Sequence, residues 1–78
     1  MKRYVSVKVM FEENGNIVPE AITWDEEHCY PISKIIDIRC KKITAKITEI
    51  KFTCVILGQI KYLYYDEKRW YVIMRNAK

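Results

Sequence analysis

The sequence predicts an all-β protein, folded as a small antiparallel curled sheet or SH3-like barrel of five to six strands. Apolar and polar residues alternate over most of the chain, which is the two-residue period of a half-buried strand. Glycine-containing turn signals, Asn14-Gly15 and Gly58-Gln59, separate such stretches. Closing the sheet would also remove free edges that promote aggregation.

The composition agrees with one compact domain. Half of the 78 residues are hydrophobic, and there are two glycines and two prolines, so we expect no disordered linker. No apolar run reaches the roughly 18 residues of a membrane span, and the N-terminus lacks the apolar stretch of a secretory signal. Three cysteines, an odd number, indicate a reducing compartment. We therefore expect a cytoplasmic protein without membrane contact.

A single domain is expected over residues 1–78, with strands near 3–12, 17–24, 29–40, 50–57, 60–65 and 69–75. The first two form a hairpin, because Asn14-Gly15 suits the positive φ angles of a two-residue type I′ turn. That turn pairs Phe11 with Val18, Val7 with Ile22 and Val5 with Trp24 on the core face. Glu20 does not fit this face, and Pro19 cannot donate to a ladder, so we expect a bulge or an edge there.

The third strand follows an acidic turn, Asp25 to Glu27. Its even positions form the predicted core face, namely Tyr30, Ile32, Ile36, Ile38 and Cys40. Ile35 points the other way, which requires either cover or a nearby bulge. For residues 41–51 we favour an extended or bulged connection over a helix, because threonine and isoleucine crowd a helix and suit a pleat.

The C-terminal third reads as a three-stranded meander. Gly58-Gln59 suits a type II′ turn, and Glu67-Lys68 forms the next turn centre. This register predicts one core face, which consists of Phe52, Cys54, Ile56, Leu63, Tyr65, Trp70, Val72 and Met74, with Lys61 as its exception. The opposite face is nearly as apolar.

A set of short motifs resembles a family of short, uncharacterised bacterial single-domain β proteins. They are Pro19-x-x-Ile22-x-Trp24-Asp25, Thr53-Cys54-x-Ile56-x-Gly58, Tyr62-Leu63-x-Tyr65 and Trp70-Tyr71-Val72, and the similarity covers residues from about 17 to 74. The resemblance implies a bacterial, stand-alone β protein, and it carries over no activity or site residues. The family's stretch near 43–50 is glycine-rich, whereas here it consists of isoleucine, threonine and lysine.

Motifs for catalysis and metal binding are weak, so we expect no enzyme activity, no cofactor, no metal and no small-molecule substrate. His28 and Cys29 are adjacent, and neighbours in a strand point to opposite faces. The cysteines lack the close pairs of a zinc site, and the acidic turn lacks the spacing of a calcium loop. The two glycines are isolated, which excludes a phosphate-binding loop.

The second apolar face of the meander is the strongest functional signal. Monomers rarely expose apolar patches above a few hundred Å², so the N-terminal hairpin or another protein should cover this face. Tyrosines are enriched at the cores of interfaces. The sequence thus predicts a protein-binding or self-associating protein, with a homodimer or another protein as partner, whose interface candidates are Val55, Leu57, Tyr62, Tyr64, Tyr71 and Ile73.

A basic stretch supports an alternative function. Single-stranded nucleic acids bind to small β barrels by stacking bases on aromatic residues beside a positive track. The net charge is +4, and the candidates are Arg39, Lys41, Lys42, Lys46 and Lys51. With the tyrosines of the second face, they predict binding to single-stranded DNA or RNA.

Overall fold

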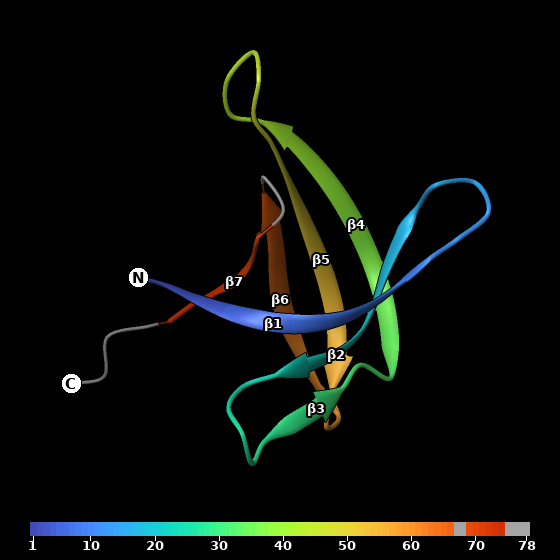
Figure 1. Cartoon of the computed structure of the whole chain (residues 1–78), viewed down its shortest axis with the longest axis vertical. Coiled ribbons are helices and arrows are strands. Elements are labelled where there is room, and N and C mark those ends of the chain that lie inside the picture. The colour runs from blue at the N-terminus through green and yellow to red at the C-terminus, as the bar shows by residue number, and fades with distance from the viewer. Residues whose placement is uncertain (67–68, 75–78) are drawn as a thin grey trace.

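The computed structural model describes residues 1–66 and 69–74, and it consists of strands and turns (Figure 1). Its strands are β1 (Lys2–Phe11), β2 (Ile17–Thr23), β3 (Cys29–Pro31), β4 (Lys34–Lys42), β5 (Thr48–Ile56), β6 (Gln59–Asp66) and β7 (Arg69–Ile73). All the paired strands are antiparallel. The all-β prediction is confirmed.

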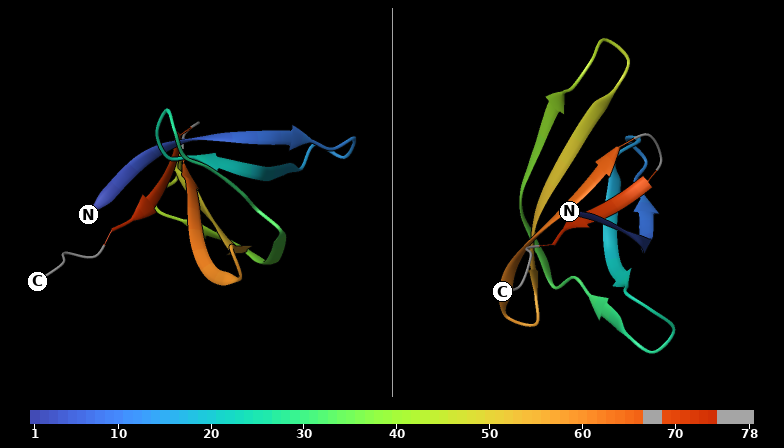
Figure 2. Two further views of the ribbon diagram at one scale, coloured as in Figure 1. Left: turned by 90° about the horizontal axis from the view of Figure 1, so that it is seen from below. Right: turned by 90° about the vertical axis from the view of Figure 1, so that its left-hand side faces the viewer.

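The strands form one sheet in the order β3-β2-β1-β7-β6-β5-β4, curled into a half-barrel. Figure 2 shows that β1 and β2 lie across the β5–β6 hairpin instead of in its plane. The two edge strands, β3 and β4, are consecutive in the chain. Between them, the strand that accepts the main-chain hydrogen bonds changes from β2 to β5. The amide of Ile32 donates to the carbonyl of Glu20 at 2.8 Å, and the amide of Ser33 donates to the carbonyl of Val55 at 2.9 Å. The prediction of one strand over 29–40 was therefore wrong, which is why the sheet has seven strands.

The N-terminal hairpin has a longer loop than the sequence predicted. The amide of Glu12 donates to the carbonyl of Asn16, and Gly15 has a φ of 88°, which is the geometry of a three-residue loop with a glycine bulge. Phe11 therefore faces Ile17 instead of Val18. The register shifts again where Pro19 faces Val9, so that Val7 faces Ile22 as predicted. The expected irregularity at Pro19-Glu20 is confirmed. It reverses the one-residue change of register that the longer loop introduces.

The β4–β5 hairpin explains the misfit at Ile35. The register shifts between Ile35 and Asp37, so a bulge at Ile36 lets Ile35 pack against the core. Ile36 and Ile38 are 50% and 53% exposed, and Cys40 is exposed as well, so their assignment to the core was wrong. Ile38 faces the buried Phe52 but lies on the edge strand, so no further described strand covers it, and the bulge turns Ile36 outward. The stretch 41–51 is not helical, as predicted, but residues 41–42 and 48–51 belong to the two strands and residues 43–47 form a hairpin loop instead of an extended connection.

The turn of the β5–β6 hairpin lies at Leu57-Gly58, one residue earlier than predicted. Both residues have positive φ angles, 51° and 75°, as a type I′ turn requires. Val55 thus pairs with Ile60, and Phe52 with Leu63, which brings two of the most buried side chains together. This shift moves the pairing by two positions, so each residue keeps its predicted face.

The register of β6 with β7 is confirmed by the pair Asp66 with Arg69. The predicted turn centre, Glu67-Lys68, lies outside the described residues, as does the predicted end of the last strand at residue 75. Met74 belongs to the predicted core face but is partly exposed, because it lies at the end of β7, past the packed core.

The core lies on the concave face of the sheet. Phe52 contacts Trp70 with ring centroids 5.5 Å apart, and Trp70 contacts Tyr65 at 4.6 Å. The buried hydrophobic residues of this cluster are Ile22, Phe52, Cys54, Ile56, Leu63 and Trp70. Phe11, which was expected in the core, is 70% exposed, because it stands at the end of the N-terminal hairpin.

Candidate functional site

The sheet is split between β6 and β7. The two strands pair only where residues 64–66 face residues 69–71. Beyond this point β7 diverges from β6, while its other edge stays paired with β1 over residues 70–73 (Figure 1), as in the pair of Val72 with Arg3. Residues 59–63 of β6 pair with β5 on one side. Within residues 1–66 and 69–74, no strand pairs with their other edge, so main-chain hydrogen-bonding groups on that edge remain available.

A cavity of about 640 Å³ opens at this split. Buried residues of the concave face form its inner part, among them Cys54 and Leu63. Leu57, Ile60, Tyr62 and Ile73, the exposed apolar residues of the cleft rim, line its mouth. Its volume lies within the range of ligand pockets, about 300–1,000 Å³. We call this cavity and its rim the β6–β7 cleft.

Lys61 is the one charged residue among the described residues that line the β6–β7 cleft. It faces Cys54 across the β5–β6 ladder, so the lysine points to the concave side, as Cys54 does. In the sequence, Lys61 stands out only as an exception on an apolar face. That irregularity was the signal for the cleft.

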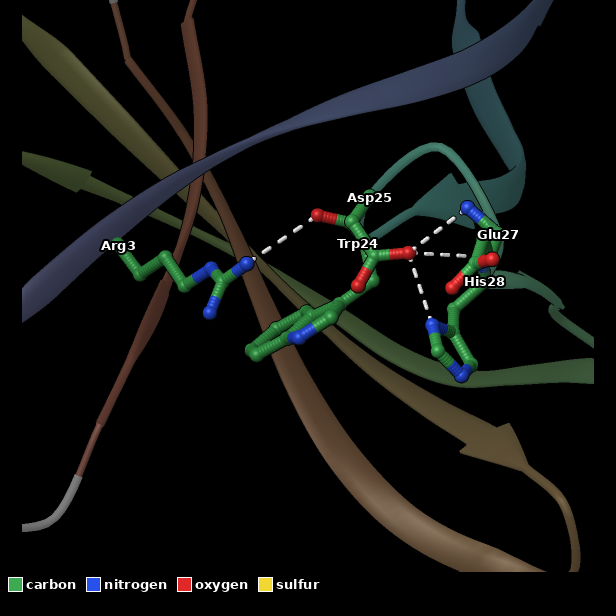
Figure 3. A network of polar contacts seen from close by, with 5 residues as sticks. All are labelled: Arg3, Trp24, Asp25, Glu27 and His28. Atoms are coloured by element: carbon green, nitrogen blue, oxygen red, sulfur yellow. Dashed lines mark hydrogen bonds and ion pairs between the residues drawn. The ribbon is translucent and has the colours of Figure 1, made fainter.

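Trp24 lines the far wall of the cleft and is held in place by Arg3 (Figure 3). The guanidinium carbon of Arg3 lies 3.8 Å from the centre of the indole ring, and Nη2 donates a hydrogen bond to the carbonyl of Trp24 at 3.2 Å. A cation stacked on an indole fixes the ring. Trp24 therefore contributes a rigid aromatic surface to the cleft.

The predicted interface residues fall into two groups. Leu57, Tyr62 and Ile73 belong to the cleft rim, and Tyr62 is 50% exposed. Tyr64 lines the cleft and is partly buried, as is Val55 nearby. Tyr71 was wrongly assigned to an accessible interface, since it is only 1% exposed. The N-terminal hairpin does not cover the rim, because β1 extends the sheet sideways.

Tyr71 is buried by its neighbours on the convex face. Its ring lies 5.2 Å from that of Tyr64 and 5.8 Å from that of Tyr4. The ammonium group of Lys2 lies 4.4 Å from the centre of the Tyr71 ring, and the Tyr71 hydroxyl donates to a carboxylate oxygen of Glu49. Burial first, and then the bond to Glu49, raise the pKa of Tyr71.

The cross-strand pairs arrange these tyrosines and two cations in one row. Tyr4 pairs with Tyr71, Tyr71 with Tyr64, Tyr64 with Lys51, and Lys51 with Arg39. We call this the convex row. The sequence analysis missed Tyr4, because the pairing of β1 with β7 is a long-range contact.

The predicted nucleic-acid residues are only partly brought together. Arg39 and Lys51 belong to the convex row, and the ammonium group of Lys51 lies 4.5 Å from the Tyr62 ring. Lys41 faces Glu49, Lys42 lies on the opposite face of β4, and Lys46 lies in the loop. Arg39 also bonds to Asp37, with 2.8 Å between Nε and Oδ2.

The turn before β3 contains His28, whose Nδ1 lies 2.8 Å from Oδ1 of Asp25 (Figure 3). This hydrogen bond, together with one from the amide of Glu27, lowers the pKa of Asp25. The same oxygen also accepts from the amide of His28, which is typical of a turn. Cys29 is exposed, whereas burial raises the pKa of Cys54 to about 11, so Cys54 is a thiol at neutral pH. The described residues hold no group of three potential metal ligands.

Comparison with known proteins adds no relative. No family model, no curated protein and no solved structure matches the chain. Within the described residues, no helix has the length and apolar character needed to cross a membrane.

Proposed function

We propose that this protein is a non-enzymatic, cytoplasmic protein-binding module that takes up an extended segment of a partner protein in the β6–β7 cleft. The observation that carries the proposal is the free edge of residues 59–63 beside an apolar cavity. A strand added to a free edge gains main-chain hydrogen bonds, and pockets beside it select alternate side chains.

The chemistry of the cleft defines the segment that fits. Its apolar walls suit β-branched or aromatic side chains at every second position. Lys61 favours an acidic residue, because an ionised partner forms a stronger hydrogen bond with it than a neutral one. The segment is therefore extended, apolar at alternate positions and acidic near its centre.

Binding of a synthetic peptide tests this proposal. A short peptide that alternates valine with threonine around a central aspartate is expected to change the fluorescence of Trp24 and to shift the amide NMR signals of residues 59–63. Lys61→Gln is expected to weaken binding by about tenfold, which corresponds to about 1.4 kcal/mol and to the lower end of the range for a hydrogen bond to a charged group. Lys8→Gln, on β1, is the matched control and should leave binding unchanged.

Methylation of the peptide's main-chain nitrogens separates strand addition from simple apolar contact. The methylated peptide keeps its side chains but cannot donate to the edge of β6, so we expect it not to bind. Equal binding of both peptides would contradict strand addition. If no shift of residues 59–63 occurs at any peptide concentration, the cleft is not the docking site.

The convex row supports a second candidate, binding of single-stranded nucleic acid. Tyr4 and Tyr64 offer rings for stacking at one end of the row, and Lys51 and Arg39 offer charge at the other. Affinity for a random oligonucleotide should fall by about 0.7 logarithmic units per contacted phosphate for each tenfold rise in salt. The substitutions Lys51→Gln and Arg39→Gln should reduce that slope, whereas Lys8→Gln should not. Lack of binding at low salt would exclude this function.

A further inference from the structure

β4 is an edge strand whose bulge at Ile36 and terminal lysines leave residues 37–40 as the regular part of its outer edge. It is nine residues long, it pairs with β5 alone, and it ends the sheet. Its outer part belongs to a hairpin that projects from the rest of the sheet (Figures 1 and 2). Ile36 and Ile38 are half-exposed on this strand. A long edge with exposed isoleucines favours pairing with another strand.

Residues 36–40 are complementary to themselves. In an antiparallel pair of two β4 strands centred on Ile38, each Ile38 faces its copy, and Ile36 faces Cys40. Asp37 then faces Arg39 of the other chain, and Arg39 faces its Asp37. Opposite charges that face each other stabilise such a pair. Within one chain, Asp37 and Arg39 form an ion pair that is exposed to solvent. Their charged groups are therefore accessible to the same groups of a second chain.

Asp37 and Arg39 limit the pairing to this register, and the basic ends of β4 limit its length. Moving the centre by two residues in either direction removes the contact of Asp37 with Arg39. In the centred register Lys34 faces Lys42, and like charges that face each other are unfavourable. The ladder between the two chains therefore ends soon after Ile36 and Cys40. Because both chains use the same edge, the pairing gives a closed twofold dimer and not a fibre.

The accessible surface leaves room for such an interface. The chain exposes 6254 Å², whereas a compact monomer of this length exposes about 5,000 Å². A ladder of about five residues uses only part of this excess and less than the roughly 800 Å² that each partner contributes to a standard interface, which is typical of a weak, transient dimer.

We propose that two copies of this protein pair antiparallel along the outer edges of their β4 strands, with Ile38 on the twofold axis. The surface is distinct from the β6–β7 cleft. Each copy of the dimer keeps its cleft open.

A disulfide at the axis tests the register. Residues that face each other across an antiparallel pair have Cα atoms about 4.5–5.5 Å apart, which lies within the disulfide range of about 4.4–6.8 Å. In a protein with Cys29→Ser and Cys40→Ser, mild oxidation of Ile38→Cys should therefore give a covalent dimer. Ile43→Cys, in the loop of the same hairpin, and Ile60→Cys, on the cleft rim, are the matched controls and should remain monomeric on a denaturing gel.

A charge exchange tests the pairing of Asp37 with Arg39 without cysteines. Asp37→Arg places arginines opposite one another and should raise the dimer dissociation constant by about tenfold or more, because both symmetric contacts become repulsive. The double variant Asp37→Arg, Arg39→Asp restores opposite charges and should dimerise as the natural sequence does. Sedimentation velocity measures both. A natural sequence that stays monomeric at high micromolar concentration, crosslinking at Ile60→Cys instead of Ile38→Cys, or failure of the double variant to recover would each overturn the proposal.

Discussion

Phe52→Ala is expected to remove a large part of the folding stability of this protein. The ring is 2% exposed and packs against Trp70 and opposite Leu63. Truncating a buried phenylalanine leaves a cavity and costs about 3–5 kcal/mol, while small proteins have a total stability of roughly 5–15 kcal/mol. Urea unfolding followed by circular dichroism should show a much lower midpoint for the variant.

Phe11→Ala is the matched control, because it makes the same chemical change at a residue that is 70% exposed. Such a surface substitution is expected to change the free energy of unfolding by less than about 0.5 kcal/mol. Equal losses from the two variants would mean that the concave face is not the core. The cleft built on that face would then have no basis either.

Tyr71→Phe is expected to change how the stability depends on alkaline pH. The pKa of Tyr71 is raised above the ordinary value of 10, by burial and by the bond to Glu49. Above pH 10 the unfolded chain loses the phenolic proton and the folded chain keeps it. Folding stability therefore falls as pH rises, by about 1.4 kcal/mol per pH unit for this group, and the contribution is fully present below pH 10. Tyr71→Phe should remove this part of the slope.

The same substitution should also lower the stability at neutral pH. It removes the hydrogen bond to Glu49, a bond to a charged group that is worth about 1.5–3 kcal/mol. Tyr62→Phe is the matched control, because its ring is half-exposed, and it should alter neither quantity. Denaturant unfolding of the three proteins from neutral pH to pH 11 measures both effects. Identical slopes for Tyr71→Phe and the natural sequence would contradict the buried phenol.

Local patterns in the sequence were sufficient for the all-β class and for the faces of the C-terminal meander. The alternation in the meander assigned Phe52, Leu63 and Trp70 to one face, and the structure buries all three. This prediction survived an error in the position of the turn, because a shift of two residues preserves the face. The misfits at Glu20 and Ile35 correctly marked irregular pairing, since a bulge is the way to keep a pattern in register.

The candidate sites depended on contacts between distant segments. The cleft exists because β7, whose other edge is paired with β1, diverges from β6 after Tyr71. Lys61 marks an irregularity on β6, but the pattern of neither strand indicates where the two separate. The burial of Tyr71 has the same origin, since Tyr4 and Lys2 reach it from the other end of the chain. The protein-binding, nucleic-acid and family assignments remain predictions.

The sequence by itself determined that the chain is all-β and which side chains share a face within the regular stretches of a strand, because both follow from a two-residue period that a bulge interrupts, as at Ile36. Only the tertiary structure decided where the sheet splits, which tyrosines stay accessible and which edge is free. Those features arise from the order in which strands pair and from the curl of the sheet. Pairing between residues 2–5 and 70–73 leaves no trace in the pattern of either segment alone.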